Sequence, residues 1–282
     1  MFKRISNSWA LVKASAAVLQ ADKELMLFPI ISFVLSVLVL ITFAVPSVLA
    51  GLFDSTALAD SGIPLAGYIV GFLFYVVQYF VIFFCNTALV GAALIRLRGG
   101  DPTVSDGFRI ATARIGPIMG YALIAATIGM ILRAISERSG ALGKIVVSLV
   151  GIAWNVATFL VVPVLAAENI GPIDAVKRSS EYLRKTWGEQ IAGNAGMGAV
   201  FGLLSFGTIL GGIALFIAAA MTESGLLMAV VGVGTIVSLM GLALVSSTLA
   251  GIYAAALYRY AAEGDAGNFF SPDLVKGAFQ RK

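Results

Sequence analysis

The sequence predicts an all-α fold, a polytopic membrane bundle of six transmembrane helices with amphipathic interfacial helices on the cytoplasmic side. Apolar residues make up 59% of the 282 residues and charged residues only 12%, an excess of apolar side chains that a soluble domain of this size does not need. The uncharged positions are gathered into six long runs, and most lysines and arginines lie on one side of those runs.

Each of the six runs is long enough to cross a hydrocarbon layer of ~30 Å, which takes about 20 helical residues. The runs cover residues 25–53, 61–95, 115–132, 145–167, 190–222 and 224–258. The third run is the shortest, with 18 residues, and it requires the side chain of Arg133 to extend toward the membrane surface.

The positions of the cationic side chains predict the orientation of the helices. Of the 19 lysines and arginines, only Arg133, Arg138 and Lys144 lie on the side predicted to be external. We therefore expect a multi-pass protein of the cytoplasmic (inner) membrane. Both termini would be cytoplasmic, and three short external turns would lie near 54–62, 135–143 and Glu223.

The predicted domain organisation has three parts. Residues 1–24 form an amphipathic cytoplasmic helix, 25–260 form the transmembrane domain with amphipathic returns at 101–114 and 168–189, and 261–282 form a basic cytoplasmic tail. The predicted apolar face of the first helix consists of Phe2, Ile5, Trp9, Val12, Ala16 and Leu19.

Proline stands near the start of three charged segments, in Asp101-Pro102, Gly171-Pro172 and Ser271-Pro272. Asp101 and Ser271 are suitable N-cap residues, and proline fits the first turn of a helix. This pattern fits a unit of two spanning helices and one surface helix that is repeated three times. It equally fits coincidence, because many helices begin with proline.

The most charged segment is the return at 168–189. Pro172 begins a predicted helix with an apolar stripe at Ile173, Val176, Leu183 and Trp187. Its basic residues are Lys177, Arg178, Arg184 and Lys185. This combination favours a helix in the lipid headgroup layer, and the alternative is a solvated helix that packs on the rest of the protein.

Two sets of residues are candidates for function. The first is the small-xxx-small pairs Gly198/Gly202 and Gly207/Gly211 in the fifth run, which allow close helix packing within one bundle or, alternatively, between copies of the chain. The second is the polar residues within the runs, which either line a path for a solute or join helices by hydrogen bonds. They are Tyr75, Gln78, Asn86, Asn155 and Asn194.

Catalytic residues are harder to find in this sequence. There is no histidine, and Cys85 is the single cysteine. Glu168 is expected either to pair with Arg96, Arg98 or Lys177 or to be solvated. Glu263 and Asp265 are weakly spaced for a metal and lack a third ligand. We therefore predict no catalytic, cofactor or metal site, and a protein that is not an enzyme.

Two short motifs carry a resemblance to known proteins. They are Asn7-Ser8-Trp9 with Asp22-Lys23-Glu24-Leu25 and Phe28-Pro29, and Pro172 followed by 175–179, Ala-Val-Lys-Arg-Ser. In these motifs the chain resembles uncharacterised prokaryotic six-helix membrane proteins, classed as a domain of unknown function. It is also similar to the membrane domain of some glycerophosphodiester phosphodiesterases. The resemblance implies the fold and a prokaryotic membrane, and no catalytic residue carries over.

The resulting hypothesis is a non-enzymatic scaffold or partner-binding helical bundle. The alternative is a channel or transporter for a small or lipidic solute. The expected partners are membrane lipids, through anionic headgroups at the cytoplasmic face, and a homo-oligomer or another membrane protein. Nucleic acid is not expected, because the net charge is only +4.

Overall fold

The computed structural model describes residues 2–51, 65–187, 196–271 and 274–275. Regular structure over these residues is helical, and six of the helices found there are long and apolar enough to cross a membrane. The predicted fold class is therefore confirmed. The six spans are Lys23–Leu49, Leu65–Leu97, Ile115–Arg138, Ala141–Ala167, Val200–Ala220 and Gly225–Glu263.

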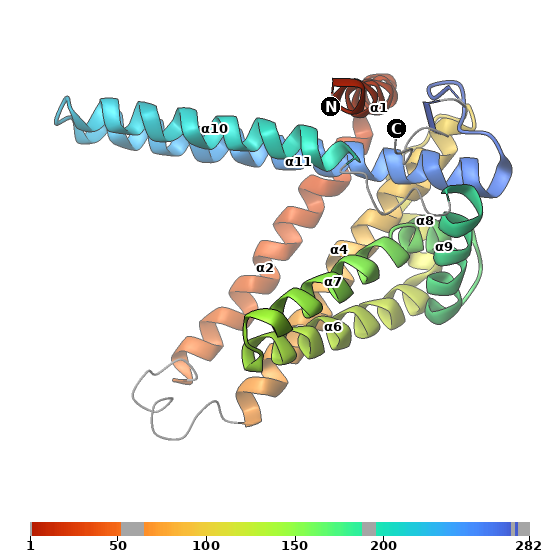
Figure 1. The fold of residues 1–282 in the computed structure, drawn as a ribbon, viewed down its shortest axis with the longest axis horizontal. Helices are drawn as coiled ribbons and strands as arrows, with labels where there is room; N and C mark the ends of the chain where they lie inside the picture. Colours follow the sequence, from red (N-terminus) through yellow and green to blue (C-terminus); the bar gives the residue numbers. More distant parts are fainter. Residues whose placement is uncertain (1, 52–64, 188–195, 272–273, 276–282) are drawn as a thin grey trace. The chain divides into compact units, whose positions relative to one another are not determined.

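The chain divides into two compact units. One unit consists of Leu27–Ala92 and Pro102–Leu183 and the other of Met1–Met26, Ala93–Asp101 and Arg184–Lys282. We call them the middle unit and the terminal unit. The helices of the middle unit, drawn in Figure 1, are α2 (Leu27–Leu49), most of α4 (Leu65–Leu97), α5 (Val104–Ala113), α6 (Ile115–Arg138), α7 (Ala141–Ala157), α8 (Val161–Ala167) and most of α9 (Pro172–Trp187).

The short helix α5 begins with a capping box. Thr103 Oγ1 accepts the N–H of Asp106 at 3.2 Å, and Asp106 Oδ2 accepts the N–H of Thr103 at 3.0 Å. The hydrogen bonds that the N–H and the hydroxyl of Thr103 donate to Asp106 Oδ2 lower the pKa of this carboxyl below its ordinary value. The prediction that Asp101 caps this helix is wrong, because the Thr-x-x-Asp sequence two residues later forms both bonds.

Glycines bring α5 close to α4. A Cβ atom added to Gly107 would lie 2.7 Å from the backbone oxygen of Ala88, and one added to Gly91 would lie 2.9 Å from Ile110 Cδ1. The ring of Phe108, on the same helix, packs 5.3 Å from the ring of Phe28 in α2. The connecting helix is therefore part of the packed core of the middle unit.

The fourth apolar run is interrupted. α7 ends at Ala157 and α8 begins at Val161, with a turn at 158–160 between them. Pro163 explains the interruption, because proline lacks an N–H and its ring conflicts with the carbonyl four residues earlier, here that of Phe159. At its other end α7 follows α6 after only Ser139 and Gly140, so the two helices form a tighter hairpin than the turn predicted at 135–143.

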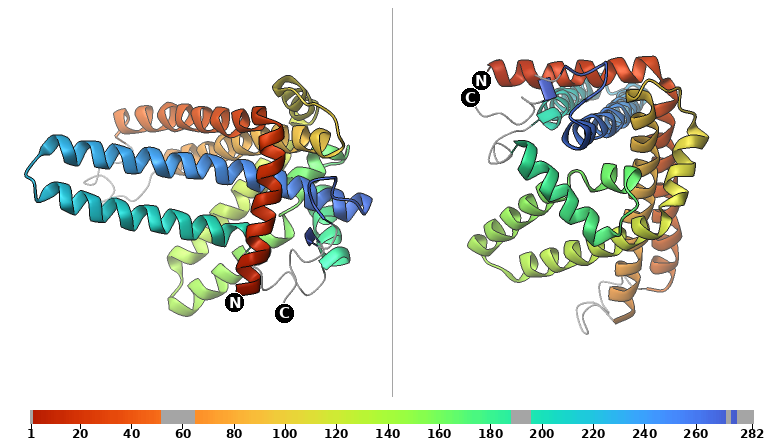
Figure 2. Two further views of the ribbon diagram at one scale, coloured as in Figure 1. Left: turned by 90° about the horizontal axis from the view of Figure 1, so that it is seen from above. Right: turned by 90° about the vertical axis from the view of Figure 1, so that its right-hand side faces the viewer.

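The terminal unit is built on a long helical hairpin. α10 (Gly196–Ala220) and α11 (Gly225–Glu263) run antiparallel and contact each other along their length (Figure 1). Their turn contains Glu223, near which the third external turn was predicted, and Ser224 Oγ accepts the N–H of Leu227 at 3.4 Å. Helix α1 (Phe2–Ala21) crosses this hairpin and contacts both helices, as Figure 2 shows.

One glycine brings the two helices of the hairpin together. A Cβ atom added to Gly212 would lie 2.5 Å from Thr235 Cγ2 of α11. Gly198, Gly202, Gly207 and Gly211, the four predicted packing positions, have no such neighbour within 4 Å in the described structure. The close contact of α10 within this chain is therefore at Gly212, and contact of the other four with a second copy stays a prediction.

The buried face of α1 agrees with the predicted one only in part. Val12 is buried as predicted, but Leu11, Ser15 and Val18 are also buried, whereas Trp9 is 46% exposed. The sequence pattern identified the most apolar stripe, but the face that packs includes the small Ser15. Small residues allow closer approach between helices, and apolar periodicity does not report this.

Candidate functional site

The polar residues predicted to line a path lie mainly on α4. Arg133 Nη1 of α6 donates to the Tyr75 hydroxyl at 3.0 Å, and its Nε donates to Glu137 at 2.7 Å. Both Arg133 and Glu137 are more than half exposed. Arg133 therefore has a tyrosine and a carboxylate as partners, and its extension toward the membrane surface stays a prediction.

An aromatic column continues from Tyr75 along α4. The Tyr75 and Tyr79 rings stack at 6.3 Å, those of Tyr79 and Phe83 stack at 5.6 Å, and Phe83 lies 4.5 Å from Tyr121 of α6. Such ring pairs contribute about 0.5–1.5 kcal/mol beyond the area they bury. This side of α4 is therefore a packing surface that joins it to α6.

The other lining candidates are not brought together. Gln78 Oε1 is buried without a hydrogen-bond partner among the described residues. Asn86 is half-buried on α4 and Asn155 is exposed on α7, while Asn194 lies outside the described residues. Within the part of the chain that the structure describes, no hydrogen bond joins these candidates to one another.

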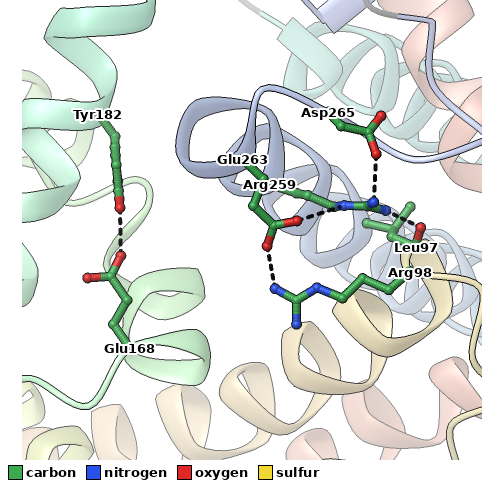
Figure 3. Close-up of polar contacts among 7 residues, drawn as sticks. All are labelled: Leu97, Arg98, Glu168, Tyr182, Arg259, Glu263 and Asp265. Atoms are coloured by element: carbon green, nitrogen blue, oxygen red, sulfur yellow. Dashed lines mark hydrogen bonds and ion pairs between the residues drawn. The ribbon is translucent and has the colours of Figure 1, made fainter.

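Helix α9 supplies a better defined polar cluster, which we call the Glu168 cluster. Glu168 ends α8 and is 18% exposed. Its carboxylate accepts from the Tyr182 hydroxyl at 2.8 Å, as Figure 3 shows. It also accepts from Arg178 Nε at 3.1 Å, and both donors lie on α9. Of the two alternatives for Glu168, pairing with a cation is therefore confirmed and solvation is wrong, but the partner Arg178 was not among the predicted ones.

The Glu168 cluster changes the acidity of its neighbours. Burial of the phenol, and then its hydrogen bond to Glu168, raise the pKa of Tyr182 above its ordinary value. The hydrogen bond to Glu168 likewise raises the pKa of Arg178, whose guanidinium also lies 5.6 Å from the Tyr182 ring. Both shifts keep the donors protonated and support an ion pair that joins helices.

The buried face of α9 agrees with the predicted apolar stripe at Leu183 but not at Ile173. Ala175, Ser179 and Leu183, spaced by four residues, are buried, whereas Ile173 is 61% exposed. Lys177, Arg184 and Lys185 are also exposed, and Lys177 pairs with Asp174 at 3.5 Å. The side chain of Trp187 lies outside the described structure, and the place of this helix in the headgroup layer stays a prediction.

The terminal unit contains a second cluster, the Arg259 cluster, near the end of α11. The Arg259 guanidinium donates to Glu263 Oε2 at 3.1 Å, to Asp265 Oδ2 at 2.6 Å and to the backbone oxygen of Leu97, the last residue of α4 (Figure 3). Arg98 donates to the other oxygen of Glu263. Four ionisable side chains are thus paired around one helix end.

This pairing favours a structural role for Glu263 and Asp265 over metal binding. The two carboxylates that had weak metal spacing both bind Arg259. Gly267 follows at φ +83°, and a Cβ atom there would lie 2.7 Å from Leu97 O. The arrangement closes the end of α11 onto the end of α4 and gives these acidic residues a structural role.

Sequence reasoning missed Ser179, Tyr182 and Arg259. Ser179 stands at the centre of the buried face of α9, where it interrupts apolar residues at i−4 and i+4. A buried polar side chain in such a position normally has a hydrogen-bond partner. This signal could have identified Ser179, whereas the long-range partners of Tyr182 and Arg259 depend on the packed fold.

Six apolar spans, joined by capped and ion-paired segments, define a helical multi-pass membrane protein. The chain belongs to a family of unknown function (DUF6159), whose model matches residues 65–269. The match includes both the Glu168 and the Arg259 clusters. None of the curated proteins compared with the chain matches it, and no link to glycerophosphodiester phosphodiesterases is shown.

Proposed function

We propose that this protein is a non-enzymatic scaffold of the cytoplasmic membrane that binds a second copy or another membrane protein through the α10–α11 hairpin. The main support is a stripe of exposed small residues on each helix, which we call the small-residue face. It consists of Gly207, Gly211, Ala214 and Ala218 on α10, and Gly234, Ser238 and Gly241 on α11.

The spacing of these residues by three and four puts each stripe on one side of its helix. Counted from the Gly212–Thr235 contact at 3.6 residues per turn, the two stripes fall on the same side of the hairpin. Apart from the neighbouring residues of its own helix, no described atom lies within 4 Å of a Cβ atom added to Gly207, Gly211, Gly234 or Gly241. Small residues let backbones approach closely in lipid, where helix association depends on packing.

The charged clusters support a non-enzymatic role. Glu168, Glu263 and Asp265 accept hydrogen bonds from guanidinium or phenol groups that join helices. A general acid or base needs its proton-transfer site free to meet a substrate. These carboxylates are occupied in structural contacts, which favours binding over catalysis.

The orientation we infer places both termini in the cytoplasm, with α9 on the inner leaflet. The exposed Lys177, Arg184 and Lys185, together with the exposed Ile173, suit an anionic headgroup layer. Anionic lipids would then orient the scaffold without being its main partner.

Site-specific photocrosslinking in native membranes tests the scaffold. In a Cys85→Ser background, a diazirine probe is attached to Gly211→Cys and, as a matched control, to Ile213→Cys, which is exposed on the other side of α10. We expect a protein adduct at position 211, either with a second chain or with another membrane protein, and lipid adducts at position 213. Lipid adducts alone at both positions would contradict the proposal.

The alternative function is a channel or transporter for a small or lipidic solute. The buried oxygen of Gln78 on α4 is the observation that favours it, because a buried polar atom without a protein partner can face a solute or water. Liposomes with purified protein test it. Solute flux that Gln78→Leu abolishes, with Asn155→Leu as an exposed control, would replace the scaffold by a pore.

A further inference from the structure

The interruption of the fourth span leaves backbone groups that a continuous helix would pair. In a continuous helix the Leu160 N–H would bond to Val156 O, and Ala157 O would accept from Val161 N–H. Here Phe159 N–H occupies Val156 O at 3.1 Å, and Val161 N–H turns to Thr158 O at 3.0 Å. Among the groups that the interruption frees are a donor, the Leu160 N–H, and an acceptor, the Ala157 carbonyl.

A single side chain of α9 satisfies both groups. Ser179 Oγ donates to Ala157 O at 2.7 Å and accepts the Leu160 N–H at 3.0 Å. Ser179 and Leu160 are both fully buried. A hydroxyl group fits this place because it donates and accepts at the same time, and serine does so within the space of a small residue.

Helix α9 is held against this position from both sides of Ser179. At its start, Pro172 packs on Gly120 of α6, where an added Cβ atom would lie 2.7 Å from Pro172 Cγ. Near its end, Tyr182 binds Glu168 at the end of α8. Ser179 therefore lies between two further contacts of α9, that of Pro172 with Gly120 and that of Tyr182 with Glu168.

We propose that α9 is a docked latch, and that its release and the bending of the span at residues 158–160 are one two-state motion. When α9 lifts away, the Leu160 N–H and the Ala157 carbonyl lose their shared partner in a buried place. An unpaired buried backbone group is costly, so the interruption must then rearrange. Ser179 is a positioning residue in this motion, because it acts through the backbone of α7 and α8.

Hydrogen exchange of the full-length protein in nanodiscs tests the latch. Ser179→Ala is expected to speed exchange in peptides that cover residues 157–161 and α9 by about tenfold, since the Leu160 N–H and the Ala157 carbonyl each lose the hydrogen bond to the Ser179 hydroxyl. Ser180→Ala is the matched control: Ser180 Oγ donates to Val176 O of its own helix at 3.0 Å and reaches Ala157 O only at 3.4 Å, whereas the Leu160 N–H bonds to Ser179. We therefore expect a much smaller acceleration in this variant than in Ser179→Ala. The amides of α10 provide an internal reference for global unfolding.

A second variant separates the latch from a general loss of stability. Pro163→Ala restores the missing N–H and lets α7 and α8 form a continuous helix, which no longer needs Ser179. The double variant Pro163→Ala/Ser179→Ala should therefore recover slow exchange at 157–161. Unchanged exchange in Ser179→Ala would overturn the proposal, as would equal acceleration in α10 that the double variant does not reverse.

Discussion

The two charged clusters both lie at helix C-termini, but they are built around opposite charges. The Arg259 cluster is centred on a guanidinium that is 13% exposed and donates to the last carbonyl of α4. The Glu168 cluster is centred on a carboxylate that itself ends α8. A helix C-terminus carries partial negative charge and unpaired carbonyls, so a cation stabilises it and an anion does not.

This difference suggests different roles for the two centres. Arg259 supplies a hydrogen-bond donor and a positive charge to the end of α4. Glu168, by contrast, must itself be stabilised by Arg178 and Tyr182. In the first cluster the central residue contributes stability. In the second, the central residue is an attachment point that fixes α9, and its charge opposes the helix dipole.

The largest expected effect is the loss of Arg259. Arg259→Ala removes three hydrogen bonds and leaves Leu97 O and two carboxylates without their shared donor. We expect the free energy of unfolding to fall by about 3 kcal/mol, measured in mixed detergent micelles. Arg259→Lys should recover less than half of this loss, because an ammonium group cannot reproduce the planar fork of donors. Equal stability of the lysine variant and the wild type would contradict the geometric argument.

The next largest effects are expected at two glycines, one in each unit, where an added Cβ atom would be crowded. Gly267→Ala should lower the free energy of unfolding by about 1–3 kcal/mol, because its φ of +83° disfavours a side chain and its Cβ atom would meet Leu97 O at 2.7 Å. Gly120→Ala meets the ring of Pro172 at the same distance but on a helical backbone. It should cost less, since a ring can shift and helical alanine is favourable. Thermal unfolding of both variants decides the order.

Much of the fold could be predicted from the sequence because membrane spans depend on the length and polarity of local segments. The six apolar runs correspond to six spans, of which the fourth consists of α7 and α8, and α9 begins at Pro172 as predicted. The break after Ala157 was visible in principle, since Pro163 stands inside the fourth run. It was not predicted because proline is also tolerated in spanning helices when other groups satisfy the backbone.

The candidate site was less predictable because its contacts join distant segments. Apolar periodicity selected Ile173 for the buried face of α9, but the packed face contains Ser179, which pairs with backbone groups about 20 residues earlier. Similarly, Arg259 binds the backbone of Leu97, which precedes it by 162 residues. Charge patterns within one helix carry no information on such partners, so local pairs such as Asp174–Lys177 are easier to predict.

The smallest effect concerns the hydroxyl of Tyr182 and has a pH dependence of definite sign. Tyr182→Phe removes a hydrogen bond of 2.8 Å to Glu168 and should lower the free energy of unfolding by about 1 kcal/mol at neutral pH. Because the folded-state pKa of Tyr182 is raised above its unfolded value, the stabilisation is fully present below the unfolded pKa. It is lost as the pH rises through the folded pKa.

Unfolding of the wild type and Tyr182→Phe across an alkaline pH series therefore tests the Glu168 cluster. The difference in stability between the two proteins should shrink as the pH passes about 10, where an unperturbed phenol ionises, and vanish above the folded pKa. Glu168→Gln serves as the companion variant. It keeps an acceptor for Tyr182 and removes an anion from the end of α8, so its net effect at neutral pH should stay within about 0.5 kcal/mol. A large loss in Glu168→Gln would mean that the carboxylate stabilises this helix end as strongly as Arg259 stabilises α4, and the contrast between the two clusters would no longer hold.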